Sequence, residues 1–197
     1  MATRTTLAAL SAAIQLAGAP VFASDISTVL AHPIFREIYS CTEHWQGNLP
    51  ELGDALGTDC VIQRLITVNG RTWMRAYVHD GLRNSDWYGW NKDVLSPCEC
   101  EVVRVNLNPV VNQPGVLGKP PASFLLLKRD DGIFFMLAHV AHPSVKAGDR
   151  VGSGQSIARV GNNGYSRLPH IHLGAWKGEE PLQIRFDQVA MGKLLER

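Results

Sequence analysis

The stretch that decides the fold is GNNGYSRLPHIH, which runs from Gly161 to His172. It joins a turn-rich loop to two histidines, His170 and His172, that are separated by one residue. Residues i and i+2 of a β-strand point to the same face, so a strand here would hold the two imidazole rings side by side while Ile171 enters the core. Two imidazoles directed at one point are typical of a metal site or a proton-transfer site. An isolated His-x-His is more often a pair of surface histidines, so the neighbouring sequence decides the interpretation.

A third histidine, His139, ends the apolar run FFMLAH that begins at Phe134. Between it and the His-x-His pair, short β-branched runs alternate with Gly and Asp, as in VKAGDRV (145–151) and GQSIARVG (154–161). This alternation is typical of tight antiparallel hairpins. A ladder of hairpins brings distant residues onto one sheet, so we expect His139 to lie near His170 and His172.

Taken together, residues 124–176 resemble the lysostaphin-type, LytM-like zinc metallo-endopeptidases, which cut peptide bonds in bacterial cell walls. The features that carry the resemblance are the strand-end His139, the VKAGDRV turn, the Gly-Gln-x-Ile pair, the GNNGYS loop and the PHIH motif. Their order and spacing are more specific than any one of them. The resemblance implies a mainly β fold, with an antiparallel sheet and an open groove built on the duplicated hybrid motif of this family.

The resemblance also implies a set of site residues. Family members hold zinc with the His and Asp of a His-x-Gly-x-Asp motif and with the second His of the His-x-His pair, which is His172 here. His170 and His139 become the catalytic pair that moves a proton and stabilises the transition state. The implied function is a zinc-dependent endopeptidase that hydrolyses peptide bonds of bacterial peptidoglycan, with metal-activated water as the nucleophile.

The upstream motif departs from the family pattern. The best match is ALGTD (55–59), which keeps Gly57 and Asp59 but has Ala55 in place of the ligand histidine. Asp59 opens an expected strand, so we take it as the second metal ligand. A catalytic zinc normally has three protein ligands, and the third stays open among three candidates: His44, Asp54 and His79.

Two other aspartates, Asp80 and Asp93, compete with Asp59, and turn capping is as common for each as metal binding. The choice of Asp59 implies an insertion over residues 70–93. Trp73 is interpreted as apolar cover for this insertion, whereas the DWYGW segment (86–90) either walls the groove or covers the insertion. Trp176 shares a strand face with the two histidines of PHIH and is expected under the site.

The chain of 197 residues is long enough for one domain with extensions. Its first 23 residues carry one charge, Arg4, an apolar centre and the small-x-small site VFA (21–23), which together predict a secretory signal peptide. We expect a helical or loop extension over 24–54, the metallopeptidase-like β domain over 55–186 and a C-terminal helix over 187–197. Apolar spacing between Val29 and Ile38 predicts the first helix, so short helices lie at both ends.

Strands are predicted at 60–68, 72–78, 101–106, 124–128, 133–139, 156–160, 170–176 and 182–186. Turns are predicted at Asn69-Gly70 and Asp131-Gly132, because these residues accept positive φ in two-residue hairpins. Residues 106–121 hold four prolines and are expected to form an irregular loop, which either borders the binding site or is mobile.

The numbers of acidic and basic residues limit the kinds of partner that we expect. There are 19 Lys and Arg residues against 18 Asp and Glu, and loss of Arg4 with the signal peptide balances them. The sequence shows no basic patch, so it gives no reason to expect a nucleic-acid partner. The first segment is also too short and too interrupted for a stable membrane span, which needs about 20 apolar residues. We therefore expect an exported protein, periplasmic or extracellular, whose partner is a peptidoglycan peptide. The sequence does not identify an activating protein.

Four cysteines in an exported protein allow two disulfides, with three possible pairings. Cys98 and Cys100 fall on the same face of an expected strand, where a bond between them would be strained. We therefore expect disulfides that join this pair to Cys41 and Cys60.

Three rival interpretations remain. The first is a peptidase-like binding or regulatory domain that has lost the metal, because Ala55 replaces a ligand. The second is a lipoyl- or biotin-carrier barrel, suggested by the Gly148-Asp149 turn, although such barrels need an exposed Lys between hairpin strands. The third is a structural Cys₂His₂ zinc site made by Cys98, Cys100 and the His-x-His pair.

Overall fold

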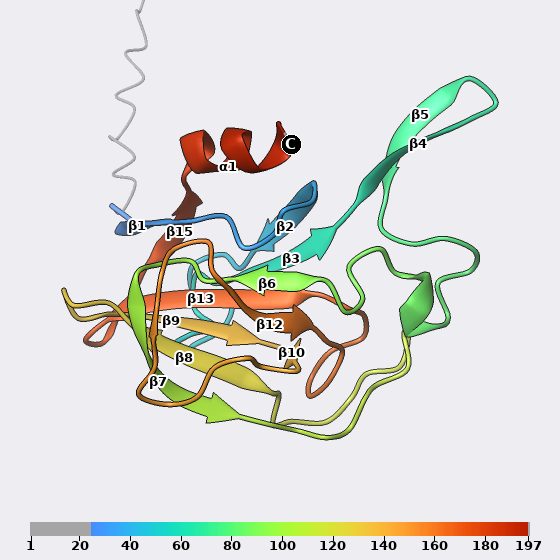
Figure 1. The fold of residues 1–197 in the computed structure, drawn as a ribbon. Helices are drawn as coiled ribbons and strands as arrows, with labels where there is room; N and C mark the ends of the chain where they lie inside the picture. Colours follow the sequence, from blue (N-terminus) through green and yellow to red (C-terminus); the bar gives the residue numbers. More distant parts are fainter. Residues whose placement is uncertain (1–24, 197) are drawn as a thin grey trace, which may run out of the picture.

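The computed structural model describes residues 25–196, so the predicted signal peptide lies outside the described residues. The fold is mainly β, with one short α-helix near the C-terminal end of the described part (Figure 1). The strands are β1 (Thr28–Ala31), β2 (Tyr39–Glu43), β3 (Thr58–Ile62), β4 (Arg64–Val68), β5 (Arg71–Arg75), β6 (Asp93–Leu95), β7 (Cys100–Asn106), β8 (Phe124–Lys128), β9 (Ile133–Ala138), β10 (Val140–Ala141), β11 (Arg150–Val151), β12 (Ser156–Val160), β13 (Ile171–Lys177), β14 (Glu180–Pro181) and β15 (Gln183–Phe186). The helices are the 3₁₀ turn η1 (Asn84–Asp86) and α1 (Gln188–Leu195).

The strands form one large sheet and three small ones. The large sheet has eight strands in the order β11-β7-β8-β9-β13-β3-β2, with β14 paired to β13, and all its pairs are antiparallel. A three-stranded antiparallel sheet has the order β10-β12-β6, β1 pairs with β15 in parallel, and β4 pairs with β5. The prediction of a mainly β fold with an antiparallel sheet is confirmed. The large sheet is open, which argues against the carrier-barrel alternative.

The hydrophobic core lies between the large sheet and the three-stranded sheet. Alternate residues of β8, β9 and β13 enter it, and they meet side chains of β6 and β12 in one continuous cluster: Leu125, Leu127, Phe135, Leu137, Ile171, Leu173, Val94, Ile157 and Val160. Each large apolar side chain that is fully buried contributes about 1.5–3 kcal/mol relative to exposure. The core therefore fixes β9 and β13, the two strands that end and begin at the predicted site histidines.

The prediction of a short helix near the N-terminal end is wrong. In residues 25–54 the structure has β1 and β2 and no α-helix. In β1 the buried Val29 and Ala31 alternate with the exposed Leu30, which is the period of a strand, and β1 pairs with β15. Pro33 follows one residue after β1, and the buried Ile34 and Phe35 then anchor an irregular segment. The helix predicted at the other end is observed as α1, where the Asp187 side chain caps the first turn.

The predicted strand 60–68 is interrupted at Gln63. β3 stays in the large sheet, whereas β4 leaves it and forms a hairpin with β5 that projects from the body of the molecule (Figure 1). The turn is at the predicted residues, Asn69 and Gly70, which have φ values of 52° and 72°. We refer to residues 64–75 as the projecting hairpin.

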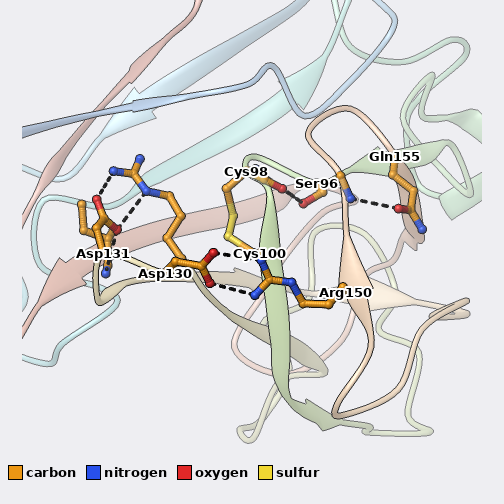
Figure 2. Close-up of a disulfide and its surroundings, with 10 residues drawn as sticks. Ser96, Cys98, Cys100, Asp130, Asp131, Arg150 and Gln155 are labelled. Atoms are coloured by element: carbon orange, nitrogen blue, oxygen red, sulfur yellow. Dashed lines mark hydrogen bonds and ion pairs between the residues drawn. A yellow bond between two sulfur atoms is a disulfide. The ribbon is translucent and has the colours of Figure 1, made fainter.

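The predicted disulfide pairing is wrong. Cys41 bonds to Cys60, and Cys98 bonds to Cys100. Figure 2 shows the second bond next to the ion pair between Asp130 and Arg150. Strand β7 begins only at Cys100, and Cys98 lies in the preceding bend, where its carbonyl accepts a hydrogen bond from Ser96 Oγ. The two cysteines therefore do not share a regular strand face, which removes the reason to exclude a bond between them. The bond between Cys98 and Cys100 also rules out the structural Cys₂His₂ zinc site, since both sulfur atoms are used in the disulfide.

No helix in the described part of the chain has the length and apolarity needed to cross a membrane.

Candidate metal centre

Strand pairing places the predicted ligands in one row across the large sheet. His172 of β13 lies opposite Ala138 of β9 on one side and opposite Asp59 of β3 on the other. Asp59 in turn lies opposite Thr42 of β2. Directly opposed residues share a face of the sheet, so the side chains of Asp59 and His172 point to the same side. His44 follows Thr42 by two residues and reaches the same place from the edge of the sheet.

Three side chains at this row could hold one metal ion. Ligand atoms of His44, Asp59 and His172 all lie within 4.8 Å of one another. Nδ1 of His172 is 2.9 Å from Oδ1 of Asp59, and Nε2 of His44 is 3.4 Å from Oδ2 of the same carboxylate. Two imidazoles and a carboxylate form a zinc ligand set that leaves a fourth position for water. Of the three candidates left open by the sequence, His44 is the one that joins Asp59 and His172 here.

Backbone carbonyls fix the proton on each of the two histidine ligands. Nδ1 of His44 lies 2.9 Å from the carbonyl oxygen of Asp54, and Nε2 of His172 lies 2.8 Å from that of Gly53. A carbonyl oxygen only accepts, so each of these nitrogens carries a hydrogen, and in the neutral ring the other nitrogen, which faces Asp59, has the lone pair that a metal can bind. Metal-binding histidines are typically held in this way by a partner on the far nitrogen. The donor set therefore fits a metal ion.

The two predicted catalytic histidines have the same arrangement. Nδ1 of His139 lies 2.8 Å from the carbonyl oxygen of Asn163, and Nδ1 of His170 lies 2.9 Å from that of Leu168. Each ring thus donates from Nδ1, so in the neutral ring Nε2 is the nitrogen that can accept a proton. Nε2 of His170 is 3.7 Å from Oδ1 of Asp59, and the His139 and His170 ring centroids are 4.5 Å apart. The structure therefore gathers all three predicted histidines around Asp59, and their roles remain predictions.

His139 has an unusual backbone conformation at the end of β9. Its φ is 64°, which is uncommon for a residue other than glycine. The backbone turns here from β9 to β10, and this turn directs the buried ring toward His170 instead of along the strand. Strained residues of this kind occur often at functional sites.

The GNNGYS loop holds His139 in place through buried amides. Besides the carbonyl that binds the ring, the Asn163 side chain donates to the carbonyl of Val140 and accepts from the backbone N–H of Ser123. The buried Asn112 donates to the carbonyls of Gly164 and Ser166. The irregular segment predicted at 106–121 is thereby attached to the site. This favours the prediction that the segment borders the binding site over the prediction that it is mobile.

Electrostatics in the cluster centre on Asp59. Burial alone would raise the pKa of its carboxyl group, but hydrogen bonds and charges from His170 and His172 outweigh burial and lower it well below the usual range. Burial disfavours charge on His172, yet the hydrogen bond and charge of Asp59 raise the pKa of that ring. Burial, followed by the neighbouring His170, lowers the pKa of His139 to about 3. His139 is therefore neutral at neutral pH.

Close backbone packing positions the loop above His172. A β-carbon on Gly174 would lie 1.7 Å from the carbonyl oxygen of Gly53, and one on Gly57 would lie 2.8 Å from Cε1 of His172. Only glycine at 174 lets the loop approach β13 closely enough for Gly53 to bind His172. Trp176 also packs under this loop: a β-carbon on Gly53 would lie 3.2 Å from its ring.

The site opens into a groove of about 740 Å³. The four histidines and both Asp54 and Asp59 line it, together with apolar side chains from the surrounding segments: Leu49, Leu117, Phe124, Met136 and Leu168. This volume is typical of ligand sites, which combine apolar walls with a few convergent polar groups. The groove can therefore hold a peptide-sized ligand across the cluster.

The other candidates lie elsewhere or have structural partners. His79 is not part of the cluster and is exposed. Asp80 caps a turn by accepting from the backbone N–H of Leu82, and Asp93 pairs with Arg159 at 2.8 Å. The remaining candidate for the third ligand, Asp54, does reach the site, where its Oδ1 lies 3.2 Å from Nε2 of His172.

The aromatic residues of the insertion do not wall the groove. Trp87 donates to the carbonyl of Gly81 and packs on Tyr77, and none of residues 86–90 lines the groove. Trp73, which we expected to cover the insertion, is 43% exposed on the projecting hairpin.

Sequence reasoning did not rank His44 above its competitors because it missed β2. Residues 39–43 read YSCTE, with aromatic, β-branched and cysteine side chains that favour a strand. The bond between Cys41 and Cys60 joins residues that lie directly opposite each other in β2 and β3. A strand ending at Glu43 and paired through these cysteines would have placed His44 beside Asp59.

Comparisons with known proteins identify the family of the central part of the chain. Residues 89–184 match peptidase family M23. This range includes His139, His170 and His172, whereas Asp59 and His44 lie before it.

Several solved structures are similar over most of the chain. The catalytic domain of the antimicrobial peptidase lysostaphin from Staphylococcus simulans has 16% identity and a TM-score of 0.45, over 73% of this chain and 86% of that one. A mutant catalytic domain of the prophage-encoded M23 protein EnpA from Enterococcus faecalis has 20% identity and a TM-score of 0.43, over 75% and 87%. A zinc-containing peptidase from Vibrio cholerae has 15% identity and a TM-score of 0.38, over 72% and 53%.

Proposed function

Because residues 89–184 of this chain belong to peptidase family M23, we propose that the protein is a zinc-dependent endopeptidase that hydrolyses peptide bonds of bacterial peptidoglycan. The proposed metal ligands are His44, Asp59 and His172, and the proposed catalytic residues are His139 and His170. With the predicted signal peptide, the proposed location is outside the cytoplasm, either periplasmic or extracellular.

The observation that carries the proposal is the arrangement of the ring nitrogens of His44 and His172 between backbone carbonyls and Asp59. His44 and His172 each donate one N–H to a backbone carbonyl, so in its neutral form each ring turns a lone pair toward the ionised carboxylate of Asp59. Without a cation, the carboxylate of Asp59 repels the lone pairs of His172 and His44, which lie 2.9 Å and 3.4 Å from its oxygens. This repulsion is removed only if a ring takes up a second proton. A divalent cation satisfies all three groups at neutral pH without that proton.

Zinc bound at this position would lower the pKa of a water ligand to about 7 and would polarise a substrate carbonyl. The groove walls would orient an extended peptide across Asp59, and the apolar side chains around it would exclude bulk water. His139 and His170 both present Nε2 to the groove, because their Nδ1 hydrogens are held by Asn163 and Leu168. Either ring can then accept a proton at Nε2 and deliver it to the leaving amine.

The family motif has a ligand histidine that this chain lacks, and a histidine next to a neighbouring strand is the proposed replacement. Ala55 stands where the family has its first ligand histidine, and we propose that His44 from the end of β2 replaces it. The alternative function is a peptidase-like binding or regulatory domain without metal, for which Ala55 is the argument. The carbonyl-anchored His44 favours the enzyme, because a domain that had lost its metal would have no need of a second imidazole directed at Asp59.

The test compares the same substitution at two histidines. His44→Asn should lower zinc affinity by at least about 100-fold, since it removes a ligand and not merely an outer partner, and should abolish release of soluble peptides from purified peptidoglycan. His79→Asn is the matched control, because His79 lies outside the cluster and has a φ of 51° that asparagine tolerates. It should leave both zinc content and peptide release unchanged.

The outcomes separate the two functions. Stoichiometric zinc with chelator-sensitive peptide release supports the enzyme. Binding to peptidoglycan without release, and without zinc, supports the binding domain. Full zinc content in His44→Asn would reject the ligand set even if the enzyme is active.

A further inference from the structure

The projecting hairpin exposes an unusual amount of apolar surface. Its two five-residue strands, β4 and β5, stand outside the core (Figure 1). Leu65, Val68, Trp73 and Met74 have exposed fractions of 63%, 49%, 43% and 39%. An isolated two-stranded hairpin is at best marginally stable in water. Contact with another surface would bury these apolar side chains and stabilise the hairpin.

The backbone of the hairpin is unpaired along both outer edges. β4 and β5 form a sheet of only two strands. Among residues 25–196, no backbone group of residues 64–75 makes a backbone hydrogen bond outside the hairpin. Open strand edges are templates for the addition of another strand, and proteins normally shorten or block them. The edge of β5 is five residues long and contains no proline.

The two faces of the hairpin differ in charge. The opposed pairs Arg64 with Arg75, Ile66 with Trp73 and Val68 with Arg71 share one face. Like charges placed directly opposite each other destabilise a sheet. The other face has Leu65 opposite Met74, and Thr67 opposite Thr72. One face is therefore cationic with an apolar centre, and the other is uncharged.

No carboxylate neutralises the cationic face. None of the three arginines forms an ion pair within the described residues. Arg64 and Arg75 lie over the rings of Tyr88 and Tyr77, at 4.5 Å and 4.9 Å from the ring centroids. Arg71, at the tip, is exposed. The missing counter-charge is what a partner would supply.

We propose that the projecting hairpin is a docking site for an extended acidic segment of another protein, which adds to the outer edge of β5 as a third strand. Side chains alternate along such a segment. Its acidic residues would lie on the face of Arg71 and Arg75, and its apolar residues would lie next to Met74 and Thr72 on the other face. The main chain would provide affinity and the alternation would provide specificity, as in other cases of strand addition.

The hairpin register indicates which backbone groups receive the partner. In a hairpin with a two-residue turn, the residues that flank the turn, Val68 and Arg71, form a hydrogen-bonded pair. The next residue, Thr72, then directs its N–H and C=O outward. Proline at 72 would remove this outward donor and leave the hydrogen bonds between β4 and β5 in place.

The test uses a labelled ten-residue peptide of alternating Glu and Val, with blocked ends, and measures its fluorescence anisotropy with the full protein. The wild type should bind this peptide and should not bind the corresponding Lys and Val peptide. Arg71→Glu and Thr72→Pro should each weaken binding by about tenfold or more, since one places like charges together and the other removes a main-chain donor. The amide NMR signals of residues 71–75 should shift when the peptide is added.

Two variants serve as matched controls. Arg185→Glu makes the same charge change at an exposed position of β15, and Thr72→Val removes the hydroxyl that bonds to Thr67 while it keeps the N–H. Both should bind the peptide as the wild type does. Unchanged binding in Thr72→Pro would overturn strand addition, and unchanged binding in Arg71→Glu would overturn the acidic partner.

Two other results would also reject the proposal. Binding to phosphatidylglycerol vesicles but not to the acidic peptide would assign the hairpin to an anionic membrane surface. Self-association that Arg71→Glu abolishes, seen by sedimentation without peptide, would assign it to a second copy of this chain. Neither result bears on the metal centre, because no residue of the hairpin lines that groove.

Discussion

The two sides of the candidate metal centre are supplied by the chain in different ways. The downstream side, with His139, His170 and His172, comes from β9, β13 and the loop before β13, all within the range that matches peptidase family M23. The upstream side, with His44 and Asp59, comes from β2 and β3, which precede that range. The downstream side is recognisable as a local sequence motif, whereas the upstream side is assembled by strand pairing.

In the proposed ligand set, the upstream histidine keeps its place in space although its position in the sequence differs from that in the family motif. His172 is fixed by two neighbours in the core of the sheet, β9 and β3. His44 depends on the pairing of an edge strand and on a loop carbonyl. The following predictions test whether the upstream side is as well defined as the downstream side.

The largest effect is expected where the two sides touch. Gly174→Ala places a β-carbon against the Gly53 carbonyl, which must then move away from Nε2 of His172. A displacement of about 1 Å at such a site can lower activity by about 100-fold. We expect loss of that order in peptide release from peptidoglycan, together with weaker zinc binding in a competition titration with a chromogenic chelator.

Gly152→Ala is the control, because a β-carbon at this position would have no other atom within 4 Å and the φ of Gly152 is not positive. It should change neither activity nor zinc affinity. If Gly174→Ala kept both properties, the loop at residues 53–57 would not define the upstream side.

A smaller effect is expected from the disulfide that links the upstream strands. Replacing both Cys41 and Cys60 by alanine opens a loop with a sequence separation of 19 and should lower the free energy of unfolding by about 3 kcal/mol. The same change at Cys98 and Cys100, separated by two positions, should cost about 1.5 kcal/mol. Urea unfolding of both double variants measures the difference. Equal losses would contradict this account of the upstream side.

The last effect is confined to acid pH and concerns the pH dependence of the downstream side in zinc-free protein. His139 has its pKa lowered to about 3, against 6.5 for a free histidine. Between these values the unfolded chain binds a proton that the folded protein does not, so this residue makes stability decrease as pH falls from 6.5 toward 3. His139→Asn should flatten that decrease in urea unfolding measured across this range.

His142→Asn provides the comparison for this prediction. His142 is exposed, lies three residues further on and also has a positive φ, 45°, which asparagine accepts. It should leave the acid dependence of stability as in the wild type. An equally steep decrease in His139→Asn would mean that other groups in the cluster control it.

Much of the fold could be predicted because its strands carry local signals. β8 and β12 are observed at the predicted residues, and the turns at Asn69-Gly70 and Asp131-Gly132 follow from residues that accept positive φ. β2 and the pairing of β1 with β15 could not be predicted, since short strands at sheet edges obtain their stability from partners far away in sequence. The bond between Cys98 and Cys100 could not be predicted for a related reason, because local composition does not show that β7 begins only at Cys100.

For the site, the sequence identifies side chains but not their neighbours. His139, His170, His172 and Asp59 follow from motifs, and strand register brings them together. The backbone carbonyls that set the protons of the four histidines belong to Gly53, Asp54, Asn163 and Leu168, and no property of those side chains marks them. The choice of His44 likewise requires the register of β2 on β3.

His44 lies one residue beyond the end of β2, the strand next to Asp59, and this position has a wider consequence. The strand adjacent to a site lies about 4.8 Å away in a sheet, so a residue at or just past the end of that strand can reach the same point. A donor that is absent from its usual register can thus be provided from the side, without any change in the fold. Searches that demand a histidine at a fixed spacing before the aspartate will overlook such chains, whereas a search over cross-strand neighbours would recover them.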